Sequence, residues 1–242
     1  MKFGVQLYSL RELAERAGAE EVLRAVSDAG YDGVEFAGFY GKTPDEMKEL
    51  LKKYKLEGVS AHIRPEAVEE SLPFIDGLGI RYVFVPWVGP EEFASAEKYE
   101  KVVKDCAAAK KLLDARGVVF GYHNHAHEYA DGNDFIAKIT DEADLRAELD
   151  VFWATVAGKD AVAEMKRLSG RLALVHIKEA AEKDAATAAQ PIVGEGAVNM
   201  RGVFAEMRAQ NIPWAILEVE KYPCAEDEYL RRSLANMKKL AE

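Results

Sequence analysis

Eight short apolar segments recur along the chain at similar spacing, and this repetition constrains the fold more than any other feature. The segments begin near Lys2, Tyr31, Glu57, Ile80, Gly117, Arg146, Leu172 and Pro213. Stretches of helical period separate most of them, so one unit spans about 30 residues, the size of a strand followed by a helix. The pattern predicts parallel strands that alternate with helices, rather than a β-sandwich or an all-helical fold.

Helix boundaries in the sequence agree with this phase. The stretch Thr43-Pro44-Asp45-Glu46 has the composition of a helix start, with a capping hydroxyl, a proline and acids in the first turn. We expect helices from this point to about Lys55, from about Ser95 to Ala115, and from Asp160 to Leu168. Helix ends are marked before six of the apolar segments by residues that tolerate left-handed backbone geometry: Gly30, Gly58, Gly79, Gly117, Gly170 and Asn211.

Two parallel architectures compete, a closed eight-stranded barrel and an open doubly wound sheet. An open sheet usually carries a glycine-rich phosphate-binding turn after its first strand, whereas residues 6–11 (QLYSLR) contain no glycine. We therefore predict an α/β fold of the (β/α)8 TIM-barrel type, with residues 1–242 as a single domain. The Ala-rich, charged segment from Glu179 to Pro191 is expected to form a long loop near the active face.

The charge balance and the cysteines exclude several classes of function. The net charge of −10 argues against extended contact with nucleic acid, which depends on clustered Lys and Arg. No apolar stretch approaches the roughly 18 residues of a membrane span, and charge appears at Arg11-Glu12, too early for a signal peptide. We expect a cytoplasmic protein without nucleic-acid or membrane partners. The two cysteines, Cys106 and Cys224, lie far apart and are expected to be ordinary thiols.

Polar side chains close four successive apolar segments, where barrel strands would end. They are His123, Asp150, His176 and Glu218. Side chains alternate across a strand, so when bulky Phe120 and Tyr122 face the helices, Gly121 and His123 face the barrel axis. By the same alternation, His176 and Lys178 face the axis from the seventh segment, and Glu218 and Glu220 face it from the eighth. Because the carboxyl ends of barrel strands meet at one face, we expect these groups to lie close together.

Two imidazoles and two carboxylates form a mixed nitrogen and oxygen set that suits a transition-metal ion. We predict one divalent cation, with Mn²⁺ first and Zn²⁺, Co²⁺ or Mg²⁺ as alternatives. Asp150 taken alone could instead cap the next helix, and His62 could be a hydrogen-bonded wall residue. The spacing in residues 123–128 (HNHAHE) does not decide which histidine is the ligand, so His125 is an alternative or a substrate-pocket residue.

Six segments in chain order resemble the sugar phosphate isomerase/epimerase family of xylose isomerase-like TIM barrels. They are Gly30–Glu35, Gly121–His125, Asp150–Ala154, Leu174–Lys178, Val193–Gly196 and Ile216–Glu218. Members of that family typically bind one divalent cation, often manganese, at the ends of strands five to eight. By matching motifs, the resemblance implies His123, Asp150, His176 and Glu218 as ligands. Isomerases and epimerases commonly carry Glu at the first of these positions, and inosose dehydratases are more similar to this chain there.

The resemblance implies an enzyme that acts on a sugar or keto-sugar, phosphorylated or not. The cation would polarise a carbonyl while a base removes the proton from the adjacent carbon, which leaves an enediolate. Reprotonation gives an isomerase or an epimerase, and loss of a β-hydroxyl gives a dehydratase. We predict Glu218 as the base and Glu35 and Lys178 as further catalytic groups. The expected substrate contacts are His62, His125, Trp153, Lys178 and Glu220.

Three alternatives stay open at this point. Lys178 could be a barrel-layer lysine that pairs with Glu220 and takes no part in chemistry. The whole chain could be a non-catalytic sugar-binding barrel. The third alternative is a metal-dependent phosphodiesterase of the endonuclease IV type. Such an enzyme would need further metal ligands and a basic groove for DNA, and the five histidines and the net charge of −10 count against it. By family analogy, a homo-oligomer is expected.

Overall fold

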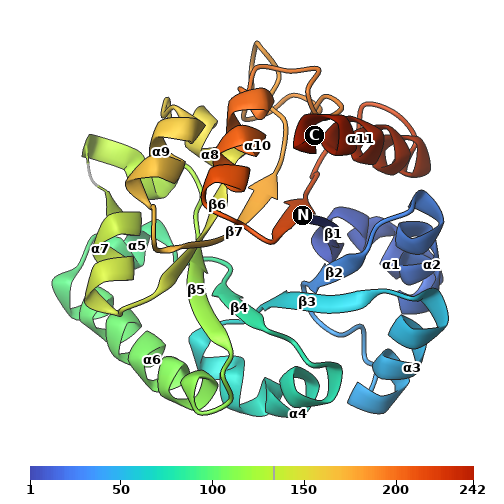
Figure 1. Cartoon of the computed structure of the whole chain (residues 1–242). Coiled ribbons are helices and arrows are strands. Elements are labelled where there is room, and N and C mark those ends of the chain that lie inside the picture. The colour runs from blue at the N-terminus through green and yellow to red at the C-terminus, as the bar shows by residue number, and fades with distance from the viewer. Residues whose placement is uncertain (133) are drawn as a thin grey trace.

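The structure, a computed structural model, is a closed barrel and describes residues 1–132 and 134–242 (Figure 1). Each strand pairs in parallel with the next one in the chain, and the last strand closes against the first. Every strand begins within two residues of its predicted start, and the predicted (β/α)8 fold is confirmed. The strands are β1 (Lys2–Gln6), β2 (Gly33–Phe36), β3 (Glu57–His62), β4 (Tyr82–Val85), β5 (Val119–His123), β6 (Arg146–Asp150), β7 (Leu172–Ile177) and β8 (Trp214–Leu217).

Helices surround the barrel and connect its strands (Figure 1). They are α1 (Arg11–Ala17), α2 (Ala19–Ala29), α3 (Pro44–Tyr54), α4 (Val68–Leu78), α5 (Pro90–Phe93), α6 (Ala96–Asp114), α7 (Phe135–Glu142), α8 (Val151–Val156), α9 (Ala161–Arg167), α10 (Met200–Ala209) and α11 (Glu226–Ala241), with short 3-10 turns η1 (Leu7–Leu10), η2 (Pro65–Ala67) and η3 (His127–Gly132). The predicted start of α3 is confirmed, because the Thr43 hydroxyl accepts from the Glu46 N–H at 3.3 Å and the Glu46 carboxylate accepts from the Thr43 N–H at 2.8 Å.

Apolar side chains fill the barrel at the level below the strand ends. Phe84, Leu174 and Ile216 belong to a buried cluster made of strand residues alone. Gly121 on β5 is needed for this packing, because a Cβ at that position would lie 2.6 Å from the Phe84 ring and 2.8 Å from the Arg146 carbonyl oxygen. Gly121 therefore faces the axis, and His123, two residues further along β5, has the same parity.

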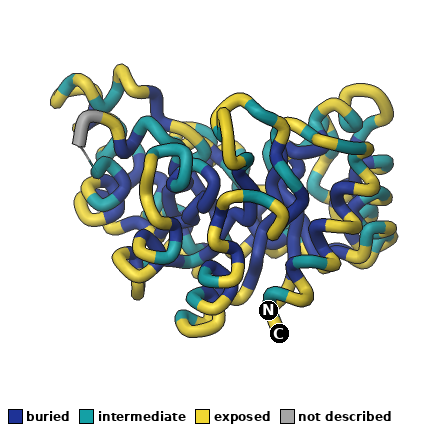
Figure 2. Tube along the Cα trace, turned by 90° about the horizontal axis from the view of Figure 1, so that it is seen from above, coloured by how far each residue is buried: buried dark blue, intermediate teal, exposed yellow. Residues whose placement is uncertain are grey.

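The opposite face of each strand packs against the helices in a second, larger core. Phe120 on β5 and Val175 on β7 are buried in this outer core, as the parity of their strands requires. Figure 2 shows the buried strands in the middle of the molecule and the exposed segments around them. Among the described residues, no helix is both long enough and apolar enough to cross a membrane.

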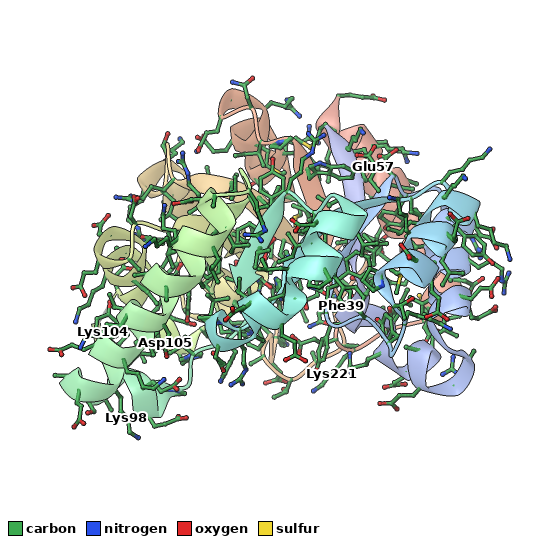
Figure 3. The ribbon with its side chains drawn as sticks, turned by 90° about the horizontal axis from the view of Figure 1, so that it is seen from below. Phe39, Glu57, Lys98, Lys104, Asp105 and Lys221 are labelled. Atoms are coloured by element: carbon green, nitrogen blue, oxygen red, sulfur yellow. The ribbon has the colours of Figure 1, made fainter. Side chains whose placement is uncertain are left out.

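The two ends of the barrel differ in the loops that they carry. Glu57, the first residue of β3, lies at one end, whereas Phe39 and Lys221, which follow β2 and β8, lie at the other (Figure 3). The predicted loop after β7 is present as turns and bends without a helix before α10. Its anchor is buried Glu179, whose carboxylate accepts from the N–H groups of Ala180, Gly194 and Val198 at 3.0, 2.9 and 2.9 Å. That loop is therefore held close to the end of β7.

Candidate active site

The four side chains predicted as ligands lie together at the carboxyl end of the barrel. One ligand atom from each of His123, Asp150, His176 and Glu218 lies within 4.8 Å of those of the other three. All four residues are buried. The pairing of β6 with β7 sets Asp150 directly beside His176. The donor set has the size and composition that a single transition-metal ion requires.

Asp150 combines the two roles that its sequence position allows. Its Oδ1 accepts from the Trp153 N–H at 2.9 Å and so caps α8, while its own N–H donates to Asn124 Oδ1 at 2.8 Å. Its Oδ2 is buried and makes no hydrogen bond within the described residues. Burial raises the pKa of Asp150 to about 7. A buried oxygen without a partner is costly, and a cation bound there would satisfy it.

Glu218 lies in a field of positive charge that favours its ionised form. Its Oε2 is 3.3 Å from His176 Nδ1 and 3.3 Å from Lys178 Nζ. Burial opposes ionisation, but Lys178 and His176 hold the pKa of Glu218 well below its usual range. The ammonium of Lys178 also contacts the Glu220 carboxylate and lies 3.9 Å from Asp150 Oδ2. Burial opposes that charge too, but these acids raise the pKa of Lys178.

His125 lies beside the ligand set as a neutral imidazole. Its ring centroid is 5.0 Å from that of His123 and 5.4 Å from that of Trp153. Its backbone N–H donates to Glu128 Oε2 at 2.8 Å, which fixes the turn after β5. Burial lowers the pKa of His125 to about 3. The side chain is therefore neutral at neutral pH and can donate or accept a hydrogen bond.

A cavity of about 470 Å³ opens onto the ligand set from the loop side of the barrel. This volume lies within the range of small-molecule sites. Tyr8 and Trp87 at its edge are 46% and 41% exposed, which is unusual for aromatic rings of this size. Lys178 is fully buried and reaches the site from behind Glu218 and Glu220. The lining residues are Tyr8, Ala37, His62, Pro86, Trp87, His123, His125, Trp153, Glu218 and Glu220.

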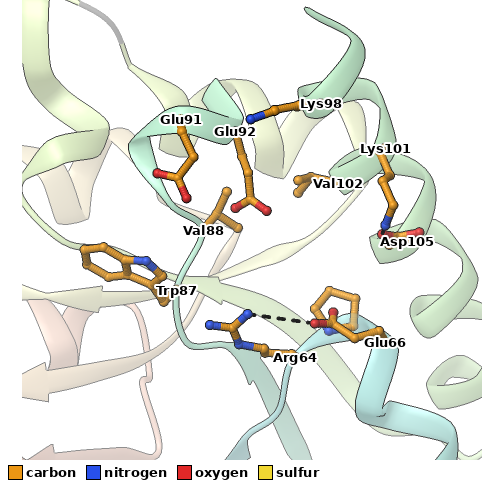
Figure 4. A pocket seen from close by; sticks show the side chains of 11 residues that line it. Arg64, Glu66, Trp87, Val88, Glu91, Glu92, Lys98, Lys101, Val102 and Asp105 are labelled. Carbon is orange, nitrogen blue, oxygen red and sulfur yellow. Dashed lines mark hydrogen bonds and ion pairs between the residues drawn. The ribbon is translucent and has the colours of Figure 1, made fainter. Parts of the chain in front are cut away.

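A second cavity of about 440 Å³ adjoins the first, and Trp87 lines both (Figure 4). Its lining includes both acidic and basic side chains, and some of them form ion pairs. Arg64 Nη1 lies 3.9 Å from Glu66 Oε1, and Lys101 Nζ lies 2.6 Å from Asp105 Oδ2. The concentration of imidazoles and inward-facing acids is thus found in the first cavity, and we take that cavity as the candidate active site.

Glu35 and His62, two further predicted residues, differ in their access to the cavity. The Glu35 carboxylate is fully buried and contacts His176 and His62 rather than the cavity. The side chain of His62 is 10% exposed and lines the cavity, and its Nε2 is 2.7 Å from Glu148 Oε2. The structure therefore separates Glu218 and His62, which line the cavity, from Glu35, which does not.

Sequence reasoning missed Glu148 and Gln6, which are fully buried inside the barrel. Glu148 Oε2 lies 3.3 Å from His123 Nδ1 and 3.2 Å from His176 Nε2. A signal for it existed, because Glu148 stands two residues before Asp150 and so has the same inward parity. Gln6 ends β1 in register with Glu35 on β2, which no pattern within either segment reveals.

Comparison with known proteins places this barrel in a family. The family described as xylose isomerase-like TIM barrel matches residues 23–240. The chain therefore belongs to the xylose isomerase-like TIM-barrel family, as its sequence motifs predicted.

Individual relatives are distant but match over almost their whole length. An inosose dehydratase of Geobacillus kaustophilus is 22% identical over 267 residues, covering 92% of this chain and 87% of that protein. A sugar phosphate isomerase/epimerase from Parabacteroides distasonis superposes with a TM-score of 0.78 at 20% identity, covering all of both chains. A D-allulose 3-epimerase from Methylomonas sp. gives 0.77 at 15% identity, covering 99% of this chain and 96% of that one.

Proposed function

We propose that this protein is a divalent-metal-dependent enzyme that removes a proton next to the carbonyl of a keto-sugar, and that the outcome is isomerisation or epimerisation. The observation that carries the proposal is the position of Glu218. Its carboxylate belongs to the ligand set, lines the cavity and lies 3.3 Å from the ammonium of Lys178. A carboxylate that lines a sugar-sized cavity beside a candidate cation site is within reach of a substrate proton, which is the first requirement for a general base.

His123, Asp150, His176 and Glu218 would hold the cation, for which we propose Mn²⁺. Their two imidazoles and two carboxylates fit such an ion, and Asp150 Oδ2 makes no hydrogen bond within the described residues. When bound, a divalent cation polarises a carbonyl and so lowers the cost of the negative charge that develops after proton loss.

The remaining groups have roles that follow from their positions. Glu218 receives the proton at its carboxylate. Lys178 keeps a fixed positive charge beside it, at 3.3 Å, and its two acidic partners prevent it from moving into the cavity. Protonated Glu218 can return this proton to the neighbouring carbon, and His125, a neutral imidazole, can donate a hydrogen bond to a substrate hydroxyl. Tyr8 and Trp87 offer aromatic faces on which a sugar ring can stack.

Dehydration is the second candidate, and one feature of the ligand set favours it. Epimerisation by two opposed carboxylates needs an acid on each side of the substrate, whereas β5 contributes His123 to this set. The relative from Geobacillus kaustophilus is named an inosose dehydratase. In this reaction Glu218 still removes the first proton and then delivers it to the β-hydroxyl, which departs as water, while neutral His125 would hold that hydroxyl by a hydrogen bond.

The proposal is tested with purified protein, Mn²⁺ and a panel of keto-sugars and inososes in D₂O. We expect deuterium at the carbon beside the carbonyl, and the product distinguishes an isomer, an epimer and a dehydrated compound. Glu218→Gln should lower the exchange rate by about 10²–10⁴-fold, the usual contribution of a general base. The control is Glu195→Gln, because Glu195 pairs with exposed Arg232 outside the cavity. Full exchange in Glu218→Gln would remove Glu218 from this role, and a protein that binds no divalent ion would favour a sugar-binding barrel.

A further inference from the structure

A chain of hydrogen bonds runs from the backbone after β1 to the imidazole of His176. It begins at the N–H of Tyr8, which donates to Gln6 Oε1 at 2.9 Å. Because this bond uses the amide oxygen, the amide nitrogen of Gln6 faces the other way and donates to Glu35 Oε1 at 2.8 Å. The backbone thus fixes the direction of the chain, and Glu35 has to be the acceptor.

The same carboxylate oxygen of Glu35 lies 2.6 Å from Nε2 of His176. An ionised carboxylate only accepts hydrogen bonds, so this nitrogen carries the proton. On the other side of the ring, Nδ1 lies 3.3 Å from Glu218 Oε2, within the proposed ligand set. A ring nitrogen binds a metal ion only through a free lone pair. Nδ1 faces a carboxylate as well and can carry a proton when no cation is bound, but the shorter bond to Glu35 occupies Nε2, so Nδ1 is the nitrogen at which a cation would replace a proton.

We infer that Gln6 and Glu35 are positioning residues for the cation site, because they fix the tautomer and the orientation of His176. The inference rests on the proposed metal-dependent function. It assigns Glu35 an action through His176 rather than on the substrate, because Glu35 is completely buried and does not itself line the cavity. Carboxylates that accept from a metal-bound imidazole usually raise the affinity of a metal site by 10–100-fold.

Glu148 and His62 lie beside Glu35 and hold it in place. Glu148 Oε2 lies 3.2 Å from His176 Nε2, so the proton on this nitrogen faces two carboxylate acceptors. His62 Nε2 bridges the two acids, at 2.7 Å from Glu148 and 3.2 Å from Glu35. The other tautomer, with the proton on Nδ1 alone, would place the Nε2 lone pair against both carboxylates, which is unfavourable in a buried site.

The test measures the affinity of the chain for Co²⁺ alone, by competition with a chromophoric chelator, and records the visible absorption of the bound ion. Wild-type protein should bind one Co²⁺. Glu35→Gln keeps the shape but removes the charge, and it should bind Co²⁺ about 10–100-fold more weakly with an altered absorption spectrum. Gln6→Met removes the donor to Glu35 and should weaken binding by a smaller factor. The matched control is Glu164→Gln, another buried carboxylate, which pairs with Arg167 outside the barrel and should bind Co²⁺ as wild type does.

A second readout separates positioning from general loss of structure. In Zn²⁺-loaded wild-type protein with ¹⁵N-labelled histidine, His176 should show a slowly exchanging proton on Nε2, and Glu35→Gln should lose this protection. Wild-type affinity and spectrum in a folded Glu35→Gln protein would overturn the inference while leaving the proposed function intact. If Glu35→Gln does not fold, unchanged Co²⁺ affinity in Gln6→Met overturns it. Absence of Co²⁺ binding by wild-type protein would refute the proposed metal-dependent function itself.

Discussion

Replacement of Gly121 by alanine tests the packing that directs the polar side chains of β5 into the barrel. The added Cβ would lie 2.6 Å from two carbons of the Phe84 ring and 2.8 Å from the Arg146 carbonyl oxygen. Real side chains do not approach so closely, and overpacking of this kind costs about 1–3 kcal/mol. Alanine also lowers the conformational entropy of the unfolded chain, which stabilises the folded state by about 0.4–1 kcal/mol. Because one of the contacts is to backbone, we expect Gly121→Ala to lower the free energy of unfolding by about 2 kcal/mol.

The assay is urea unfolding followed by tryptophan fluorescence and by circular dichroism, with the slope of the transition compared between proteins. A Phe84→Leu variant serves as partner, because it shortens the ring that Gly121→Ala meets. The double variant should be more stable than the sum of the single effects predicts, by about 1 kcal/mol, since residues in contact couple by about 0.5–3 kcal/mol. A Gly121→Ala protein as stable as wild type, or strict additivity with Phe84→Leu, would refute the inward orientation of Gly121 and therefore the parity argument for His123.

Two further predictions concern protons and metal. In metal-free protein, burial lowers the pKa of His125 to about 3, whereas the unfolded chain titrates near 6.5, so the unfolded state alone binds this proton as the pH falls below about 6.5. Between pH 7 and pH 5, wild type should therefore lose about 2 kcal/mol more unfolding free energy than His125→Asn, and equal losses would contradict the buried neutral imidazole. Addition of Mn²⁺ at about 100-fold its dissociation constant should stabilise the chelator-treated protein by about 2.7 kcal/mol, or roughly 5–11 °C in melting temperature. A melting temperature that does not respond to any divalent ion would argue against a preformed cation site.

Local sequence patterns predicted the fold to within two residues at every strand start because barrel strands and helices leave strong signals. The helix that begins after Thr43 is an example, because its capping residue, its proline and its acidic residues all lie within the first turn and together mark the helix start. Parity within single strands likewise indicated which way His123 and Glu218 face. Such signals depend only on neighbours in the chain, so they can be read without knowledge of the rest of the molecule.

Contacts between different strands leave no such local signal. Glu35 was predicted as a catalytic group, and its partners in the structure include Gln6 on β1 and His176 on β7. Gln6 was missed because the role of a glutamine in a short strand cannot be recognised until its partners are known, whereas Glu148 was missed although it shares the inward parity of Asp150. Gln6 and His176 stand 29 and 141 positions from Glu35 in the chain, and the barrel brings both to one oxygen of the Glu35 carboxylate.

The sequence by itself determined the order of strands and helices, the inward face of each strand and the identity of the four candidate ligands. The tertiary structure decided how these residues divide, with Glu218 and His125 lining the cavity and Glu35 and Glu148 buried and absent from its lining. The physical reason is that periodicity records burial and direction, which are local, whereas hydrogen-bond direction and distance depend on strand register around the closed barrel. The choice of the nitrogen that His176 offers to a cation belongs to this second kind of information.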